Sequence, residues 1–149
     1  MATMTPPRQL LIASTAFGPR LSTSAVAAAI GRGVQAGGLP EPDLCPLSPA
    51  DEATEDVRAL LDGIDFDARM RRSRAVVIAA AHLEERTLAG SLAFEIATRA
   101  RQSGVPAYAV AAENRLDSFD TRILDLQVIL EARGARSLEA AGRGLADVV

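Results

Sequence analysis

The sequence predicts an α/β fold, a three-layer sandwich whose mainly parallel five-stranded sheet is Rossmann-like or flavodoxin-like. Short apolar segments alternate with longer amphipathic ones along the chain, which is the pattern of successive parallel βαβ units. The chain has 149 residues, 48% of them hydrophobic, and a net charge of −3, so we expect one packed domain over residues 1–149. The expected strand order is 2-1-3-4-5. Residues 1–8 are expected to be flexible.

The first half of the chain predicts two strands and two helices. Residues 9–13 form a short apolar run after a Pro-rich lead, which is typical of a buried strand. Ser22 is expected to cap a helix whose apolar residues recur every four positions and which ends at Gly37. Residues 43–47 predict a second strand, short because a proline removes a ladder donor. An acid-rich start and spaced aliphatic residues predict a helix over 51–61.

The second half predicts three strands and two helices. Residues 75–79 (AVVIA) form the clearest strand of the chain. An amphipathic helix is expected over 88–102, followed by a strand over 106–111. Residues 124–131 predict the fifth strand. Ser137 is then expected to cap the last helix.

The glycines do not form a nucleotide motif. Gly31, Gly33 and Gly37 lack the G-x-G-x-x-G spacing and lie late in a predicted helix, whereas that motif directly follows a strand. Gly142 and Gly144 lie inside the last predicted helix, where each is expected to cost about 1 kcal/mol relative to alanine.

Composition excludes several classes of protein. All 16 basic residues are arginine, so a P-loop lysine and a Schiff-base lysine are both absent. One histidine and one cysteine cannot build a structural zinc site, and no metal is expected. Cys45 is expected to be a small core residue. An aromatic fraction of 3% and a mildly acidic net charge argue against nucleic-acid binding. No apolar run is long enough to span a membrane, and a cytoplasmic location is expected.

Several stretches share a pattern with one enzyme family. Residues 12–26 (IASTAFGPRLSTSAV) are similar to "IAPDSFKGSLSAxEV", and residues 73–84 (SRAVVIAAAHLE) to "ADLVITGEGRLD". Residues 87–91 (TLAGS) are similar to "TLxGK", and residues 104–106 (GVP) to "GVPV". These stretches resemble the bacterial glycerate kinases of the two-domain, non-P-loop kind. That family inserts a second domain into its Rossmann-like domain, and the resemblance implies that this chain corresponds to the Rossmann-like half alone.

The resemblance does not extend to the residues that carry the family's chemistry. Thr15 and Gly18 stand where the family has the Asp and Lys of "DSFKG", and Ser91 stands where it has the Lys of "TLxGK". The family's "GEGRLD" becomes AAAHLE over residues 79–84. Phosphoryl transfer depends on positioning and on cations that neutralise the transferred group. The resemblance therefore indicates a kept scaffold with largely substituted chemistry.

Two functions follow from this pattern. The first is a degenerate glycerate-kinase-like domain, catalytically inactive alone, that acts as a small-molecule binding or protein-interaction module. No cofactor is then expected, and the ligand is a small organic acid or a nucleotide. The alternative is an active minimal glycerate kinase, which transfers phosphate from ATP with Mg²⁺ and is completed by a partner chain. We also expect a homodimer, because the absent domain would otherwise leave an apolar face uncovered.

Candidate ligand-binding residues lie where strands are expected to end, since open α/β sheets bind ligands at the carboxyl ends of their strands. These candidates are Thr15, Ser22, Glu52, His82, Glu84, Thr87 and Asn114.

Each candidate also has a simpler interpretation. Ser22 begins a helix, where an anion can bind, but ordinary capping explains it as well. His82 can act as an acid or base near neutral pH, or it is a surface residue. Glu113 follows the fourth expected strand at the same edge of the sheet and could belong to the same site as His82. Glu52 belongs to an acidic run that suggests Mg²⁺ or, more simply, the start of a helix. The arginines between 69 and 74 are expected to form a solvated helix end.

Overall fold

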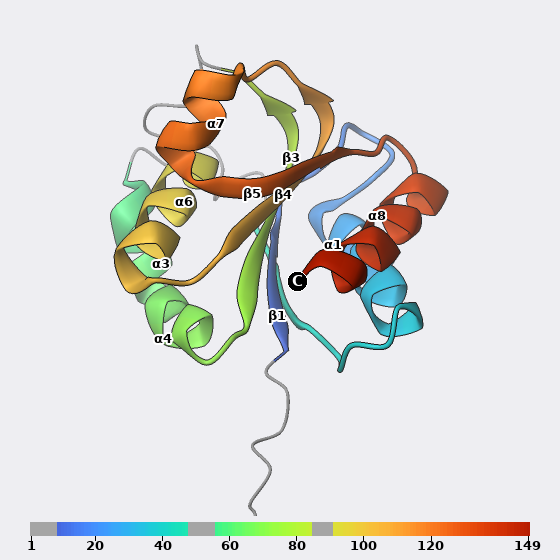
Figure 1. Cartoon of the computed structure of the whole chain (residues 1–149), viewed down its shortest axis with the longest axis horizontal. Helices are drawn as coiled ribbons and strands as arrows, with labels where there is room; N and C mark the ends of the chain where they lie inside the picture. The colour runs from blue at the N-terminus through green and yellow to red at the C-terminus, as the bar shows by residue number, and fades with distance from the viewer. Residues whose placement is uncertain (1–8, 48–55, 85–90) are drawn as a thin grey trace, which may run out of the picture.

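A computed structural model describes residues 9–47, 56–84 and 91–149, which form a five-stranded parallel sheet with helices on both faces (Figure 1). The expectation for residues 1–8 lies outside the described residues, as do the first residues of the helices expected from positions 51 and 88. The α/β class is confirmed, and the sheet order β2-β1-β3-β4-β5 is the expected one. None of the described helices is long and apolar enough to cross a membrane.

The strands follow the apolar runs of the sequence and extend beyond several of them. They are β1 (Leu10–Ser14), β2 (Asp43–Pro46), β3 (Ala75–Leu83), β4 (Ala107–Asn114) and β5 (Leu126–Glu131). β1 is buried along its whole length, as is the first half of β3. Because β3 and β4 each continue past the apolar run that predicts them, they carry polar residues to the carboxyl edge of the sheet.

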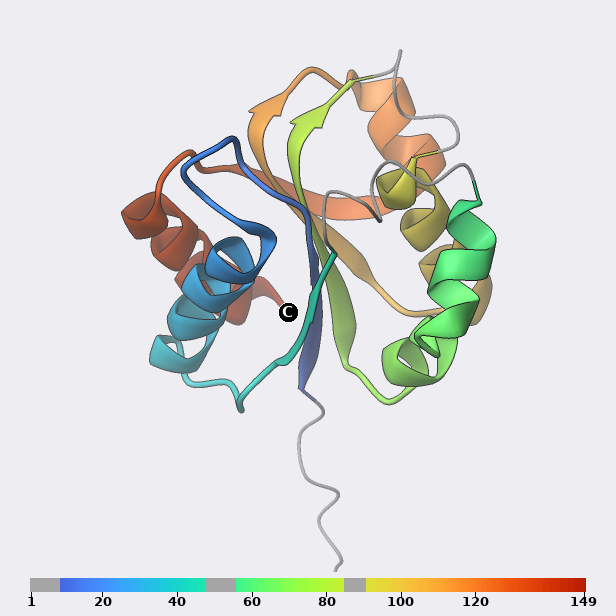
Figure 2. The ribbon, with the colours of Figure 1, turned by 180° about the vertical axis from the view of Figure 1, so that it is seen from behind.

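The helices divide into two layers, seen from both sides in Figures 1 and 2. One face of the sheet is covered by α1 (Thr23–Ala36) and α8 (Ala135–Val148). The other face is covered by α3 (Val57–Gly63), α4 (Phe66–Arg71), α6 (Leu92–Ser103) and α7 (Ser118–Leu124). Each face has its own apolar core, one centred on α1 and α8 and the other on α6 and its neighbours.

Glycines set the distance between α1 and α8. A Cβ added at Gly33 would lie 1.8 Å from the carbonyl oxygen of Glu139, and one added at Gly142 would lie 2.2 Å from that of Ile30. Both atoms belong to backbone, so only glycine permits this contact. The expectation that Gly142 merely weakens its helix is therefore incomplete. Gly144 differs, because its added Cβ would meet only a side chain, at 3.6 Å.

The structure corrects four local expectations. Arg69 and Arg71 lie within a separate short helix, α4, whereas the sequence predicts only the solvated end of a helix there. α7 was not expected, and it takes Leu124 from the fifth strand, which begins at Leu126. The chain reverses between them at Asp125, whose φ of 55° is left-handed. The last helix begins after Gly134, and Ser137 lies at its third position, where its hydroxyl accepts the Gly134 N–H.

Candidate functional site

The loop after β1 is fixed to β3 by Thr15. The backbone N–H and the hydroxyl of Thr15 both donate to the carbonyl of Ala79, at 2.9 and 3.1 Å. Ser14, one residue earlier, is buried and donates its hydroxyl to the carbonyl of Thr23 at 2.8 Å. These bonds hold the start of α1 against the sheet between β1 and β3, where the strand order reverses. Thr15 therefore positions the edge, with its hydroxyl proton already donated.

Ser22 caps α1. Its hydroxyl accepts the N–H of Ala25 at 3.2 Å, and its φ of −67° and ψ of 165° are extended, as an N-cap requires. The capping interpretation of Ser22 is thus confirmed.

β3 and β4 bring His82 and Glu113 together. The two strands pair in parallel register with His82 opposite Glu113 and Leu83 opposite Asn114. The Nδ1 atom of His82 lies 3.7 Å from Oε2 of Glu113, and the other oxygen of the same carboxylate pairs with Nε of Arg115. The His82 and Arg115 side chains are 60% and 65% exposed, and that of Glu113 is 30% exposed. One half-buried carboxylate therefore stands between two solvent-facing nitrogen groups.

Asn114 joins this edge to β5. Its backbone N–H donates to Oε2 of Glu131 at 3.1 Å, and its side-chain oxygen accepts the N–H of Leu116 at 3.1 Å. The side chain of Asn114 thus shapes the turn after β4. Glu84 directly follows β3 and is half-buried. Glu52 and Thr87 lie outside the described residues.

The structure thus gathers part of the expected site. The β3–β4 ends unite His82 with Asn114 and the adjacent Glu113, and Thr15 is bonded to the same β3 strand three residues before His82. Arg115 is a residue of this edge that the sequence pattern did not single out, although its position immediately after β4 places it beside Glu113 and Asn114. Among the described residues, no three His, Cys, Asp or Glu side chains are placed to hold a metal ion together.

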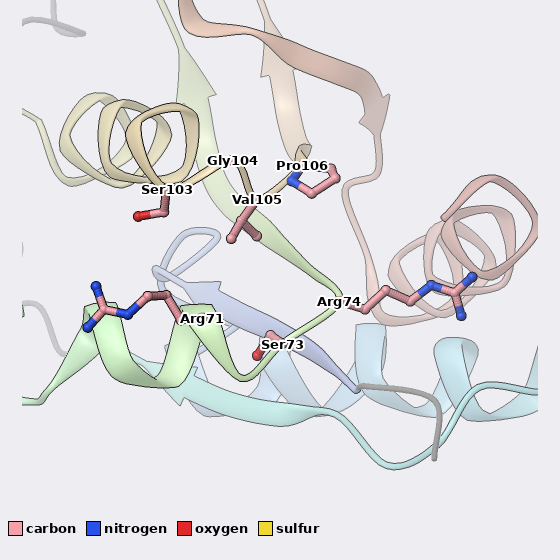
Figure 3. A pocket seen from close by; sticks show the side chains of 7 residues that line it. All are labelled: Arg71, Ser73, Arg74, Ser103, Gly104, Val105 and Pro106. Carbon is pink, nitrogen blue, oxygen red and sulfur yellow. The ribbon is translucent and has the colours of Figure 1, made fainter. Parts of the chain in front are cut away.

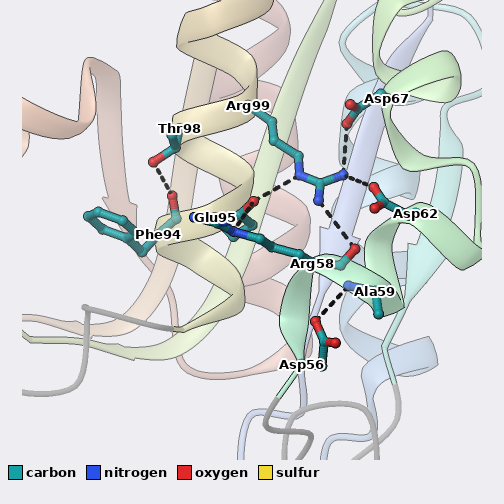
Figure 4. Close-up of polar contacts among 9 residues, drawn as sticks. All are labelled: Asp56, Arg58, Ala59, Asp62, Asp67, Phe94, Glu95, Thr98 and Arg99. Atoms are coloured by element: carbon teal, nitrogen blue, oxygen red, sulfur yellow. Dashed lines mark hydrogen bonds and ion pairs between the residues drawn. The ribbon is translucent and has the colours of Figure 1, made fainter.

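Arg99 is the centre of a second polar cluster, on the α6 face (Figure 4). Its guanidinium donates to Asp62 at 2.8 Å, to Asp67 at 3.1 Å and to Glu95 at 3.1 Å, and it also reaches the carbonyl of Arg58. Burial of the guanidinium disfavours its charged form, but these hydrogen bonds outweigh burial and the pKa of Arg99 is raised. The cluster ties α6 to α3 and α4, so its role is structural.

Arg69 corrects the expectation of a solvated helix end. Its guanidinium binds both carboxylate oxygens of Asp43, at 2.7 and 3.0 Å, and lies 3.6 Å from Sγ of Cys45. The side chain is only 23% exposed, and the hydrogen bonds with Asp43 raise the pKa of Arg69. Arg69 therefore fastens α4 to β2. Cys45 is buried, as expected of a core residue.

An open pocket of about 550 Å³ lies at the opposite, amino-terminal edge of the sheet (Figure 3). It is lined by Arg71, Ser73, Arg74, Ser103, Gly104, Val105 and Pro106. The guanidinium groups of Arg71 and Arg74 point in opposite directions in Figure 3, and that of Arg74 donates to the carbonyl of Val149 at 3.0 Å. The pocket thus lacks converging charges, and the carboxyl edge remains the better candidate site.

Comparisons with known proteins support the fold. No family model matches the chain, and no curated protein matches it. A solved structure of a putative pilus assembly-related protein from Burkholderia pseudomallei is 16% identical, with a TM-score of 0.53, over 99% of this chain and 95% of its own. An oxidoreductase from Corynebacterium diphtheriae is 15% identical, with a TM-score of 0.56, over 97% of this chain and 98% of its own. These likenesses show the α/β fold alone.

Proposed function

We propose that this chain is a binding domain for a small anionic molecule, an organic acid or a nucleotide, at the carboxyl edge of β3 and β4. The observation that carries the proposal is the pairing of His82 and Arg115 with the single carboxylate of Glu113. This group lies beside the reversal of strand order, where open α/β sheets take their ligands. A ligand carboxylate or phosphate would take the place of the Glu113 carboxylate beside Arg115. Either ligand group offers two oxygen acceptors to the same guanidinium, as the Glu113 carboxylate does.

We propose further that the domain has no glycerate kinase activity alone. The positions that resemble that family's catalytic motifs serve other purposes here. The Thr15 hydroxyl is donated to a backbone carbonyl, and the Ser91 hydroxyl accepts the N–H of Phe94 at the start of α6. Gly18 provides no side chain at all. Phosphoryl transfer needs cationic groups around the transferred phosphate, and none of these three positions supplies one.

The resemblance also implies the alternative of a minimal kinase completed by a partner chain, with ATP and Mg²⁺ as its cofactors. In that case glycerate would still bind here, and turnover would appear only when the partner is added. Binding and turnover assays therefore separate the two functions.

Isothermal titration calorimetry tests the binding proposal. The full chain is titrated with glycerate, with ATP·Mg²⁺ and with inorganic phosphate. At least one of these anions should release or absorb heat with saturation. The separate variants His82→Ala and Arg115→Ala should each weaken that binding about tenfold or more, since a charge-assisted hydrogen bond contributes roughly 1.5–3 kcal/mol.

The matched control is Arg136→Ala, which removes an exposed arginine from α8 on the other face of the sheet. This variant should bind like the unaltered chain. If all three anions fail to bind, or if Arg136→Ala weakens binding as much as Arg115→Ala, the carboxyl-edge site is wrong.

A further inference from the structure

An open groove runs along the amino-terminal edge of the sheet, across the starts of β3, β4 and β5. It consists of the pocket of about 550 Å³ in Figure 3 and a second pocket of about 210 Å³. Residues 104–106 line both pockets, so the two adjoin. We call them together the amino-edge groove. Because it lies at the opposite edge from His82 and Glu113, its occupancy is independent of the proposed binding function.

Arginines dominate the charge of the amino-edge groove. Arg71 and Arg74 line the larger pocket, and Arg101 lines the smaller one. Arg72 is exposed and lies between Arg71 and Arg74 along the chain. Among the described residues that line either pocket, Asp125 is the only acid. The helices α4 and α6 also end here, and each carboxyl end contributes about half a negative charge. The arginines outweigh these charges, so the groove is positive.

Backbone oxygens orient two of these arginines. Arg74 donates to the backbone oxygen of Val149 at 3.0 Å, and Arg101 donates to the carbonyl of Ile123 at 2.8 Å. Each of these contacts uses one nitrogen of the guanidinium. Because a guanidinium carries several N–H donors in a fixed fork, both arginines keep donors for a partner.

The placement of the guanidinium groups favours an extended partner over a small anion. Arg71 and Arg74 lie at opposite ends of the larger pocket and point away from each other, with Val105 between them (Figure 3). One phosphate or carboxylate therefore cannot contact both. In an extended chain, side chains two residues apart lie on the same side, separated by about 7 Å. Acidic residues at alternate positions can thus meet successive arginines, and apolar ones can contact Val105 and Pro106.

The charge of the whole chain favours an acidic protein segment over a nucleic acid. The chain has a net charge of −3, so the residues outside this positive groove carry an excess of acid. A long phosphate backbone would extend onto these acidic residues. In addition, an aromatic fraction of 3% provides few rings on which bases could stack. A short acidic segment of a protein stays within the groove.

We propose that the amino-edge groove binds an extended acidic segment of a partner protein. Alternate carboxylates of this segment pair with Arg71, Arg74 and Arg101, and its apolar side chains pack against Val105 and Pro106. Charge complementarity of this kind gives an interface its specificity and speeds association.

Fluorescence anisotropy of a dye-labelled peptide of four Glu-Val repeats tests the proposal with the full chain. The peptide should bind saturably at low salt and more weakly at about 0.15 M salt, where the screening length is about 8 Å. Arg71→Gln together with Arg101→Gln should weaken binding about two- to thirtyfold, because each exposed ion pair contributes up to about fivefold. Both arginines are exposed in the last turn of a helix, and glutamine keeps their helix propensity.

The matched control removes the same charge from another surface. Arg136→Gln together with Arg143→Gln replaces two exposed arginines of α8 and should leave peptide binding unchanged. Amide shifts of the ¹⁵N-labelled chain should place the peptide at Gly104 and Val105, with the amide of His82 unchanged.

Four results would overturn the proposal. The first is the absence of saturable peptide binding, and the second is a control that weakens binding as much as the groove variant does. The third is an oligothymidylate of similar length that binds more tightly than the peptide, because the groove would then favour nucleic acid. The fourth is a shift of the Gly104 amide when the chain is concentrated without peptide, because a second copy would then be the occupant.

Discussion

Replacing Gly142 with alanine should destabilise the domain, although alanine is the better helix former. The added Cβ would lie 2.2 Å from the Ile30 carbonyl oxygen, 2.9 Å from the Val34 nitrogen and 3.0 Å from the Gly33 Cα. All three are backbone atoms of α1, so α1 and α8 must separate by about 1 Å to restore ordinary contact. Overpacking of this kind costs about 3 kcal/mol at its upper typical range. The gain in helix propensity returns about 1 kcal/mol, leaving a net loss of about 2 kcal/mol.

Gly144→Ala is the matched control on the same helix. Its Cβ would contact only Cδ1 of Leu130, at 3.6 Å. This variant should therefore gain the full helix propensity of about 1 kcal/mol.

Thermal unfolding followed by circular dichroism distinguishes the two variants. For a domain of this size, 1 kcal/mol shifts Tm by roughly 2–4 °C. Gly142→Ala should lower Tm by about 4–8 °C, and Gly144→Ala should raise it by about 2–4 °C. If Gly142→Ala is as stable as Gly144→Ala, the close contact of α1 with α8 is wrong.

Three further predictions concern the polar groups. Arg99→Met should cost about 2 kcal/mol in urea unfolding, because the charged hydrogen bonds to Asp62, Asp67 and Glu95 are lost; an unchanged midpoint would contradict the structural role of the cluster. That loss should be equal at neutral pH and at about pH 10, since a pKa raised in the folded state keeps the full contribution below the unfolded value; a smaller difference at the higher pH would contradict it. In a coupled ADP-release assay the chain alone should show no glycerate-dependent turnover, and a rate of about 1 s⁻¹, within the kinase range, would contradict the proposed loss of activity.

The sequence predicts the five strands and the central place of β1 and β3, whereas the order 2-1-3-4-5, which the structure confirms, was taken from the flavodoxin-like fold. β1 and β3 each have a hydrogen-bonded neighbour on both sides. Their continuous apolar runs predict this position, because the strands of a parallel sheet that helices cover on both faces are apolar along their length. The cap at Ser22 was readable because a serine precedes the first apolar repeat.

Two short helices could not be read from local pattern. α4 spans six residues, too few for a helical period, and its stability comes from buried Phe66 and Met70. α7 ends at Leu124, and Asp125 then turns the chain in a left-handed conformation without a glycine or proline to mark it.

The candidate site was predictable to the level of an edge. Placing His82 and Glu113 near each other needs only two neighbouring parallel strands, which the alternation of elements implies. Their register, and hence the 3.7 Å contact, depends on how far β3 and β4 run past their apolar cores. The ion pairs of Arg99 join segments more than thirty residues apart, to Asp62 and Asp67, and spacing along a helix reveals only its bond to Glu95.

The central claim is that small anions bind at the carboxyl edge of β3 and β4, and amide chemical shifts during a titration test it most directly. The chain is labelled with ¹⁵N and titrated with glycerate, ATP·Mg²⁺ and inorganic phosphate, each at constant pH and ionic strength. We predict saturable shifts at His82, Asn114 and Arg115 for at least one anion, with the amides around Ser73 and Gly104 unchanged. Shifts confined to Ser73 and Gly104, at the amino-terminal pocket, would contradict the claim, as would no saturable shift with any of the three.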